Sequence, residues 1–229
     1  MYKNHFVSAI IATAGKGMRF SEVTQKPYVK IGNKPILAYT VTRFQENSSI
    51  DEIVLMVHHS QVSLAGEIVS DYGFTKVSQV KEGGKTRFDT VKKGLSYSNK
   101  DSQIVLVHDG VRPLVTNELI KSVLQASIDY GAAIPAISVT NTIKEVDATG
   151  LVTKTIPRQN LFEAQTPQAF KTALLKQCYE TVFNDEEAQL TDDSMIVERC
   201  GYTVKMVPGL PTNRKITTQE DVAYIGQFL

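Results

Sequence analysis

The sequence has few cysteines, no long apolar run and almost no net charge, and each of these absences excludes a class of protein. Only Cys178 and Cys200 occur among 229 residues, so we expect two thiols in a reducing compartment and no disulfide framework. No apolar run reaches the roughly 18 residues of a membrane span. The N-terminus also lacks the apolar core of a signal peptide. We therefore expect a cytoplasmic protein that does not bind membranes.

The charges are balanced, with 25 lysines and arginines against 24 aspartates and glutamates. Such a chain has no general attraction for nucleic acid, so any anion must be bound by local clusters of cations. The composition, 42% hydrophobic and 21% charged, is that of an ordinary globular protein. A chain of this length can bury one sizeable core. We therefore expect a single domain over residues 1–229, with two small domains as the alternative.

Short apolar runs rich in β-branched residues alternate with helical patterns along most of the chain. The runs predict buried strands at residues 6–12, 53–57, 76–80, 104–107, 132–139 and 202–207. The patterns predict helices at residues 35–46, 61–72, 86–96, 117–130, 171–183, 192–199 and 219–228. Gly73, Gly131 and Gly201 follow helices where a left-handed residue is favoured, and Thr217 with Glu220 forms a capping-box pattern. The alternation predicts an α/β fold with a mostly parallel sheet between two helical layers.

Residues 140–155 break this alternation. Apolar and polar residues alternate there around an Ala-Thr-Gly turn, which predicts a β-hairpin. A hairpin has no obvious place in the central sheet of such a fold. We expect it to project from the molecule as an arm.

In a parallel α/β sheet the ligand lies beyond the carboxyl ends of the strands, and the loop after the first predicted strand is rich in small residues. Ala14, Gly15 and Gly17 allow backbone N–H groups to approach a phosphate chain, while Lys16 and Arg19 add positive charge. Lys26 is the next cation along the chain. The loop lacks both the dinucleotide-binding and the Walker glycine patterns, so the alternative is a tight turn with solvated cations.

Two later strand ends carry further candidates. A Gly-Gly pair at residues 83–84 can present backbone groups to a nucleobase, although it also fits a turn before a helix cap at Thr86. Asp109, at the end of the fourth predicted strand, is a natural Mg²⁺ ligand facing a triphosphate, or else a turn residue. His108 is more typical of a structural hydrogen-bonding residue than of a catalytic one.

The last third of the chain offers weaker signals. Arg158 follows the predicted arm, and a polar Gln-Thr-Pro-Gln turn occupies residues 165–168. Lys215, before the last helix, is either a cation for an anionic substrate or part of a solvated loop. Residues 191–193 (Thr-Asp-Asp) can form a second metal site, but they fit a helix N-terminus better.

Taken in order along the chain, these motifs resemble the 2-C-methyl-D-erythritol 4-phosphate cytidylyltransferase family. The motifs that carry the resemblance are Ala-Gly-Lys-Gly-x-Arg, Lys26, Gly-Gly-x-x-Arg, Val-His-Asp-x-x-Arg-Pro, Asn-Thr-Ile-Lys, Arg158, Gln-Thr-Pro-Gln and Asn-x-Lys-Ile-Thr. The resemblance implies a Rossmann-like nucleotidyltransferase fold, dependence on Mg²⁺, and a homodimer with an exchanged arm. It also implies transfer of a cytidylyl group from CTP to a polyol phosphate, with release of pyrophosphate.

The resemblance also implies roles for individual residues. Arg19 and Lys26 match cations that stabilise the transition state at the α-phosphate, and Arg158 and Lys215 match cations that hold the second substrate. Asp109 matches the metal–triphosphate site. The further residues that the resemblance implies for nucleotide or substrate binding are Ala14, Gly15, Lys16, Gly17, Gly84, Lys85, Thr90, Arg112, Thr142 and Thr166.

Three alternatives remain. The sister family of ribitol-5-phosphate cytidylyltransferases is the first alternative, and residues 87–90 and Val111 are more similar to it. Residues 141–144 and 191–193 are more similar to the methylerythritol family, and we favour the methylerythritol substrate. A non-catalytic nucleotide sensor on the same fold would keep the glycine loops but would not need Arg158 and Lys215. A dinucleotide-dependent reductase would need the full glycine fingerprint, which the first loop lacks.

Overall fold

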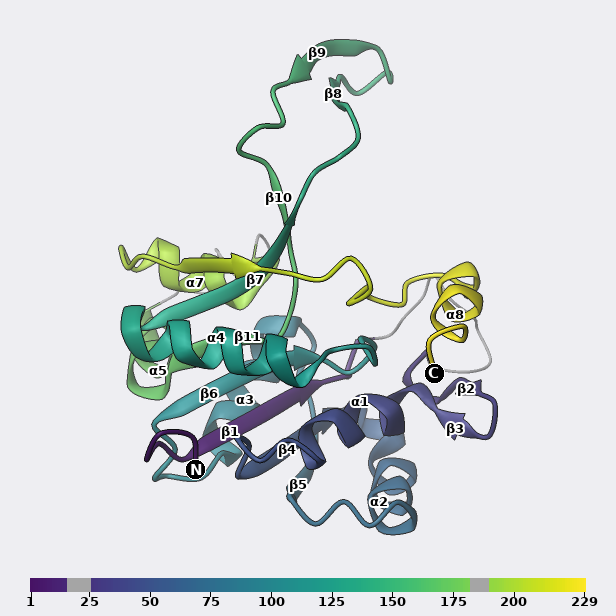
Figure 1. The fold of residues 1–229 in the computed structure, drawn as a ribbon, viewed down its shortest axis with the longest axis vertical. Coiled ribbons are helices and arrows are strands. Elements are labelled where there is room, and N and C mark those ends of the chain that lie inside the picture. Colours follow the sequence, from purple (N-terminus) through teal and green to yellow (C-terminus); the bar gives the residue numbers. More distant parts are fainter. Residues whose placement is uncertain (16–25, 182–189) are drawn as a thin grey trace.

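The computed structural model describes residues 1–15, 26–181 and 190–229, and a central sheet runs through it between two layers of helices (Figure 1). Seven strands lie side by side, and an eighth, β12 (Lys205–Pro208), pairs with β7. In their spatial order the seven are β10 (Phe162–Ala164), β7 (Ala132–Ser138), β11 (Gln168–Lys171), β6 (Ile104–Asp109), β1 (Val7–Ala12), β4 (Glu52–Val57) and β5 (Val77–Glu82).

The middle of the sheet is parallel, as the sequence predicts. β1 lies between β4 and β6, and β5 continues the sheet beyond β4. All six residues of β4 and of β6 are buried, which explains their uninterrupted apolar runs. The register places Ala12, the last residue of β1, opposite Asp109, the last residue of β6. The loops that follow these strands therefore begin next to each other.

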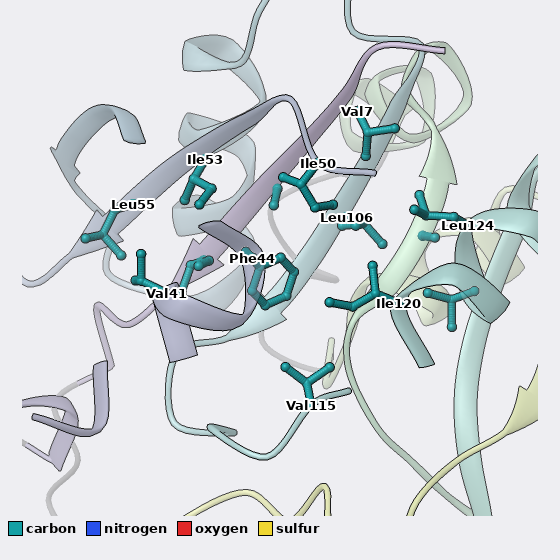
Figure 2. Close-up of a cluster of buried hydrophobic side chains, with 14 of the residues drawn as sticks. Val7, Val41, Phe44, Ile50, Ile53, Leu55, Leu106, Val115, Ile120 and Leu124 are labelled. Carbon is teal, nitrogen blue, oxygen red and sulfur yellow. The ribbon is translucent and has the colours of Figure 1, made fainter. Parts of the chain in front are cut away.

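Helices cover both faces of the sheet, which confirms the expected three layers. One layer consists of α1 (Ile36–Gln45), α2 (Val62–Asp71) and α4 (Asn117–Tyr130), which bury their apolar faces in one hydrophobic cluster. Figure 2 shows part of this cluster, with Phe44 of α1 beside Ile120 and Val115. The other layer consists of α3 (Arg87–Tyr97), α5 (Thr172–Thr181) and α7 (Asp193–Arg199), which pack in a second cluster. The last helix, α8 (Gln219–Ile225), packs separately against Ile36.

The helix ends follow the predicted chemistry, with one exception. Gly73, Gly131 and Gly201 have φ angles of 62°, 92° and 81°, so glycine relieves the left-handed backbone after each helix. The predicted capping box of α8 is wrong by one residue. Thr218, not Thr217, is the N-cap, and Asp221, not Glu220, returns the reciprocal hydrogen bond. The sequence offers two adjacent threonines and two adjacent acids, so the pattern alone does not determine which pair caps the helix.

Two strands of the central sheet were not predicted. β11 runs antiparallel to both β6 and β7, and β10 runs antiparallel to β7. Their pattern is obscured because β11 begins with the buried polar residue Gln168, whose amide hydrogen-bonds to Asp192 and to backbone N–H groups at the start of α7. A short pair, β2 (Lys30–Ile31) with β3 (Lys34–Pro35), was also missed.

The predicted hairpin is present and extends away from the body of the molecule (Figure 1). β8 (Ile143–Val146) pairs antiparallel with β9 (Val152–Ile156). Asp147 closes the turn, since its Oδ1 accepts hydrogen bonds from the backbone N–H groups of Thr149 and Leu151. Leu151 is 68% exposed and Val152 59% exposed, so the tip of the hairpin carries apolar surface without intramolecular cover.

None of the helices in the described ranges has both the length and the apolar character that a membrane span requires.

Candidate active site

A pocket of about 300 Å³ lies at the carboxyl edge of the parallel strands. Its lining comes from the loops after β1, β5 and β6 and from the segment before α8, which is the location that the fold predicts for a ligand. The predicted site residues that line it are Ala14, Gly15, Lys26, Gly84, Lys85, Thr90, Asp109 and Lys215. Lys16, Gly17 and Arg19 lie outside the described residues.

The loops after β1 and β5 meet through glycine. A Cβ on Gly83 would lie 2.3 Å from that of Ala14, and one on Gly84 would lie 2.0 Å from that of Asp89, so neither position tolerates a side chain. Thr90 accepts a hydrogen bond from the Gly84 N–H and donates one to the carbonyl of Thr86. Its hydroxyl therefore holds the loop in place. Thr86 is also the N-cap of α3, which confirms the interpretation of the Gly-Gly pair as a turn before a helix cap, while its contact with a nucleobase stays a prediction.

Asp109 is the electrostatic centre of the pocket. Its Oδ2 lies 3.0 Å from Nε of Arg112 and 3.2 Å from Nζ of Lys215, and its Oδ1 lies 3.9 Å from Nε of Arg87. Burial alone would raise the pKa of this carboxyl group. Lys215, Arg112 and Arg87 outweigh burial and hold the pKa of Asp109 far below its usual range. The carboxylate is therefore charged at neutral pH.

The segment that carries Lys215 is attached to the sheet by buried amide groups. Asn213 is fully buried, and its Nδ2 donates to the backbone carbonyl of Thr166 at 2.8 Å. The backbone carbonyl of Asn213 accepts from Nη1 of Arg112, also at 2.8 Å. Gln165 donates to the carbonyl of Leu210 and accepts from its N–H in return. These contacts bring Arg112 and Lys215 to the same oxygen of Asp109. Thr166 and Arg112 thus support the pocket from behind without lining it.

His108 has a structural environment, as the sequence suggested. Its ring is fully buried, with Nδ1 2.9 Å from Oγ1 of Thr166 and Nε2 3.2 Å from the carbonyl of Arg112. A carbonyl can only accept, so we assign the proton to Nε2 and the accepted bond to Nδ1. Burial lowers the pKa of His108 to about 4, and the imidazole is neutral at pH 7.

Sequence reasoning gave Arg87 a place in a motif but no role, and it missed the partner of Arg87. The structure pairs Nη2 of Arg87 with Oδ2 of the buried Asp193 at 2.6 Å. Asp192 caps the N-terminus of α7, which confirms the preferred interpretation of residues 191–193 as a helix start. No sequence signal links Arg87 to Asp193, because the contact joins residues more than 100 positions apart.

The structure does not bring Arg158 and Thr142 to the pocket of their own chain. Both lie at the base of the arm and are exposed, and Nη1 of Arg158 donates to the carbonyl of Thr140. The residues that line the pocket include neither of them. Their predicted contribution to the site stays a prediction that concerns a second copy of the chain.

One carboxylate oxygen is suited to a metal. Among the described residues no group of three histidine, cysteine, aspartate or glutamate side chains can enclose a cation. Mg²⁺, however, commonly uses one or two carboxylates and takes its other ligands from phosphates and water. Within the described part of the chain no hydrogen bond reaches Oδ1 of Asp109, and Asp109 lines the pocket. The site therefore fits Mg²⁺ bound together with a triphosphate.

Comparisons with known proteins show to which family the chain is similar. The family model described as 2-C-methyl-D-erythritol 4-phosphate cytidylyltransferase matches residues 7–229. A protein of that name from Alkaliphilus metalliredigens is 41% identical over 222 residues, covering 96% of this chain and 91% of the relative. Another from Clostridium botulinum (strain Loch Maree) is 40% identical, covering 97% of this chain and 96% of the relative.

Solved structures show the same similarity. The 4-diphosphocytidyl-2C-methyl-D-erythritol synthase of Anaerococcus prevotii superposes with a TM-score of 0.84 at 32% identity, covering 99% of this chain and 96% of that one. The 2-C-methyl-D-erythritol 4-phosphate cytidylyltransferase of Francisella tularensis also gives 0.84, at 29% identity, covering 98% of this chain and 100% of that one. The whole described fold is therefore common to these proteins.

Proposed function

Because the chain belongs to the 2-C-methyl-D-erythritol 4-phosphate cytidylyltransferase family, we infer that it transfers a cytidylyl group from CTP to that polyol phosphate. The products are CDP-methylerythritol, which serves isoprenoid precursor synthesis, and pyrophosphate. The observation that carries this function is the pocket itself. The pocket is lined by two loops of small residues, one at Ala14 and the other at Gly84, and by the cations Lys26 and Lys215. These groups surround one buried carboxylate, that of Asp109.

We propose that the triphosphate lies against the loop after β1, with cytosine against the loop after β5. The small residues Ala14 and Gly15 leave backbone N–H groups open to phosphate oxygens, and Lys26 adds a cation. Gly84 and Lys85 supply backbone donors and acceptors that match the amino and carbonyl groups of cytosine. Arg19 is expected beside the α-phosphate with Lys26.

The chain's own residues supply mainly positioning and charge. An oxygen of the substrate phosphate attacks the α-phosphorus in line, the bond to the bridging oxygen breaks, and pyrophosphate leaves. Negative charge grows on the equatorial oxygens and on the leaving group. Lys26 and Arg19 oppose the charge at the α-phosphate, while Lys215, together with Arg158 of a second copy of the chain, holds the incoming phosphate. No covalent protein intermediate is needed, because the attacking oxygen belongs to the substrate.

Asp109 would hold Mg²⁺ together with the triphosphate. When bound, the ion neutralises phosphate charge and helps to orient the chain of phosphates. The cations around Asp109 keep its carboxylate ionised and therefore ready to ligate.

We further propose that the protein is a homodimer in which the arm of one chain reaches the site of the other. An isolated two-stranded hairpin is marginally stable in water, and its tip exposes Val146, Leu151 and Val152. Exchange of the arms would cover this surface and bring Arg158 and Thr142 to the second substrate.

Cys178 and Cys200 are both free thiols, which agrees with a reducing, cytoplasmic setting.

Pyrophosphate release tests the proposal directly. The protein is incubated with Mg²⁺, CTP and either 2-C-methyl-D-erythritol 4-phosphate or ribitol 5-phosphate, and the reaction is repeated with ATP and UTP. We expect release with CTP and the methylerythritol substrate. Faster release with ribitol 5-phosphate would reassign the substrate, and equal turnover with ATP or UTP would reject the role of the loop after β5 in base recognition.

A further inference from the structure

An ion pair between Arg87 and Asp193 begins at the wall of the pocket, and the proposed reaction gives it no role. Arg87, in the first turn of α3, places Nη2 2.6 Å from Oδ2 of Asp193, the first residue of α7. The Asp193 side chain is fully buried, whereas that of Arg87 is 24% exposed and borders the pocket. The pair therefore joins the wall of the pocket to the helical layer behind it.

Asp193 is itself fixed in place by two neighbours. Tyr179 of α5 donates its hydroxyl to Oδ1 of Asp193 at 2.6 Å, and the Asp193 N–H donates to Oε1 of Gln168 at 3.1 Å. Burial and the charge of Asp193 raise the pKa of Tyr179 well above its usual value, so the phenol remains a donor. Asp193 is thus a stationary negative charge to which the guanidinium is tied.

Arg87 also faces Asp109 but does not pair closely with it. Its Nε lies 3.9 Å from Oδ1 of Asp109, compared with 2.6 Å from its Nη2 to Asp193. Oδ2 of Asp109 already contacts Arg112 and Lys215. Guanidinium groups favour close, bidentate pairing with carboxylates, most strongly where water is excluded. Arg87 is thus paired with Asp193 and lies apart from the remaining oxygen of Asp109.

We propose that Asp193 is a positioning residue: it draws the Arg87 guanidinium toward α7 and so keeps Oδ1 of Asp109 open to a divalent cation bound with CTP. If Asp193 loses its charge, Asp109 is the closest carboxylate left to Arg87 among the described residues, and the guanidinium moves onto Oδ1. The guanidinium then competes with the cation for the same oxygen and adds unneutralised positive charge beside it. The inference rests on the proposed function, because it takes Asp109 as the metal ligand.

The test measures binding of Mn²⁺, as a probe for Mg²⁺, to the full chain with CTP and without the second substrate. Electron paramagnetic resonance of free Mn²⁺ gives the affinity. Asp193→Asn and Arg87→Met break the same ion pair from opposite ends, so each is the matched control of the other. We expect Asp193→Asn to weaken Mn²⁺ binding by about tenfold or more, as for other residues that orient a metal ligand. Arg87→Met should leave it unchanged or tighten it, because no guanidinium remains to compete.

The double variant sharpens the comparison. Asp193→Asn with Arg87→Met should bind Mn²⁺ more tightly than Asp193→Asn alone. An ion pair with only a structural role would give similar losses in both single variants and no recovery in the double variant, and this result would overturn the proposal. Unchanged Mn²⁺ binding in Asp109→Asn would overturn it as well. All affinities are measured at a temperature at which circular dichroism shows each variant folded.

If Asp193→Asn does not fold, Arg87→Met decides the question alone, since it breaks the same ion pair and leaves no guanidinium to compete for Oδ1 of Asp109. Unchanged or tighter Mn²⁺ binding in that variant supports the proposal, and weaker binding overturns it. The proposed function fails in a different way. Wild-type protein that binds Mn²⁺ and CTP but releases no pyrophosphate with the methylerythritol substrate would refute the reaction and leave the role of Asp193 intact.

Discussion

Replacing His108 with glutamine should remove part of the acid sensitivity of the fold between pH 7 and pH 4. Burial lowers the pKa of this imidazole from 6.5 to about 4, so the folded protein keeps it neutral where the unfolded chain protonates it. Because the folded-state pKa is the lower one, the stability linked to the neutral ring is complete above pH 6.5. It is lost progressively as the pH falls toward 4.

The size of this effect follows from the two pKa values. The difference between 6.5 and about 4 corresponds to about 3 kcal/mol in the free energy of unfolding. A domain of ordinary stability has only about 5–15 kcal/mol in total. A single buried imidazole therefore accounts for a substantial part of the acid sensitivity.

Urea unfolding followed by circular dichroism, at several pH values from 7 to 4 and with a chelator present, measures the effect. His108→Gln should be less stable than wild type at pH 7, because the hydrogen bonds with Thr166 and the Arg112 carbonyl are disturbed. The gap should narrow as the pH falls, since only the wild type has an imidazole to protonate. If the free energies of unfolding of wild type and His108→Gln differ by the same amount at every pH, the imidazole of His108 is not held neutral by burial. His59→Gln, at an exposed ring, controls for the exchange of histidine for glutamine.

Three further predictions concern catalysis and assembly. Asp109→Asn should lower kcat for pyrophosphate release by about 10²-fold or more, as for other losses of charge stabilisation, and near-normal turnover would make Asp109 a turn residue. Lys215→Ala should raise KM for the polyol phosphate while calorimetry finds CTP affinity unchanged. Arg214→Ala, which removes a pair with Asp221, is its control; equal effects of the two would contradict the assignment. Sedimentation at micromolar concentration should show a dimer, and deletion of residues 143–156 should give a monomer with reduced activity; an active wild-type monomer would exclude arm exchange.

The alternation of buried strands and amphipathic helices could be predicted because each of those elements carries its own signal. β4 and β6 are buried on both faces, so their sequences contain uninterrupted apolar runs at residues 53–57 and 104–107. Gly131 closes α4 in a backbone conformation that penalises other residues, and the sequence therefore marks the end of that helix. Such signals are local, and the bounds that they predict for these elements agree with the structure to within a few residues.

β10 and β11 could not be predicted, because their order in the sheet depends on contacts between distant segments. Gln168 is polar yet 1% exposed, and its amide is satisfied by the start of α7. In the sequence it looks like a turn residue. A buried polar side chain reveals its role only when its partners are known.

The site shows the same division between local and distant information. The glycine loops and Asp109 lie at strand ends and could be identified from the sequence, and the resemblance to a family chose between the two interpretations of Lys215. Neither source indicated that Arg112 and Lys215 share one oxygen of Asp109 while Arg87 is held back by Asp193. A site that must bring together two phosphate substrates of like charge depends on where each cation is held as well as on how many there are. The positions of the cations are determined by the buried residues with which they pair behind the pocket. Substitutions of residues that never touch a substrate should therefore alter the binding of metal and phosphate as much as substitutions in the lining.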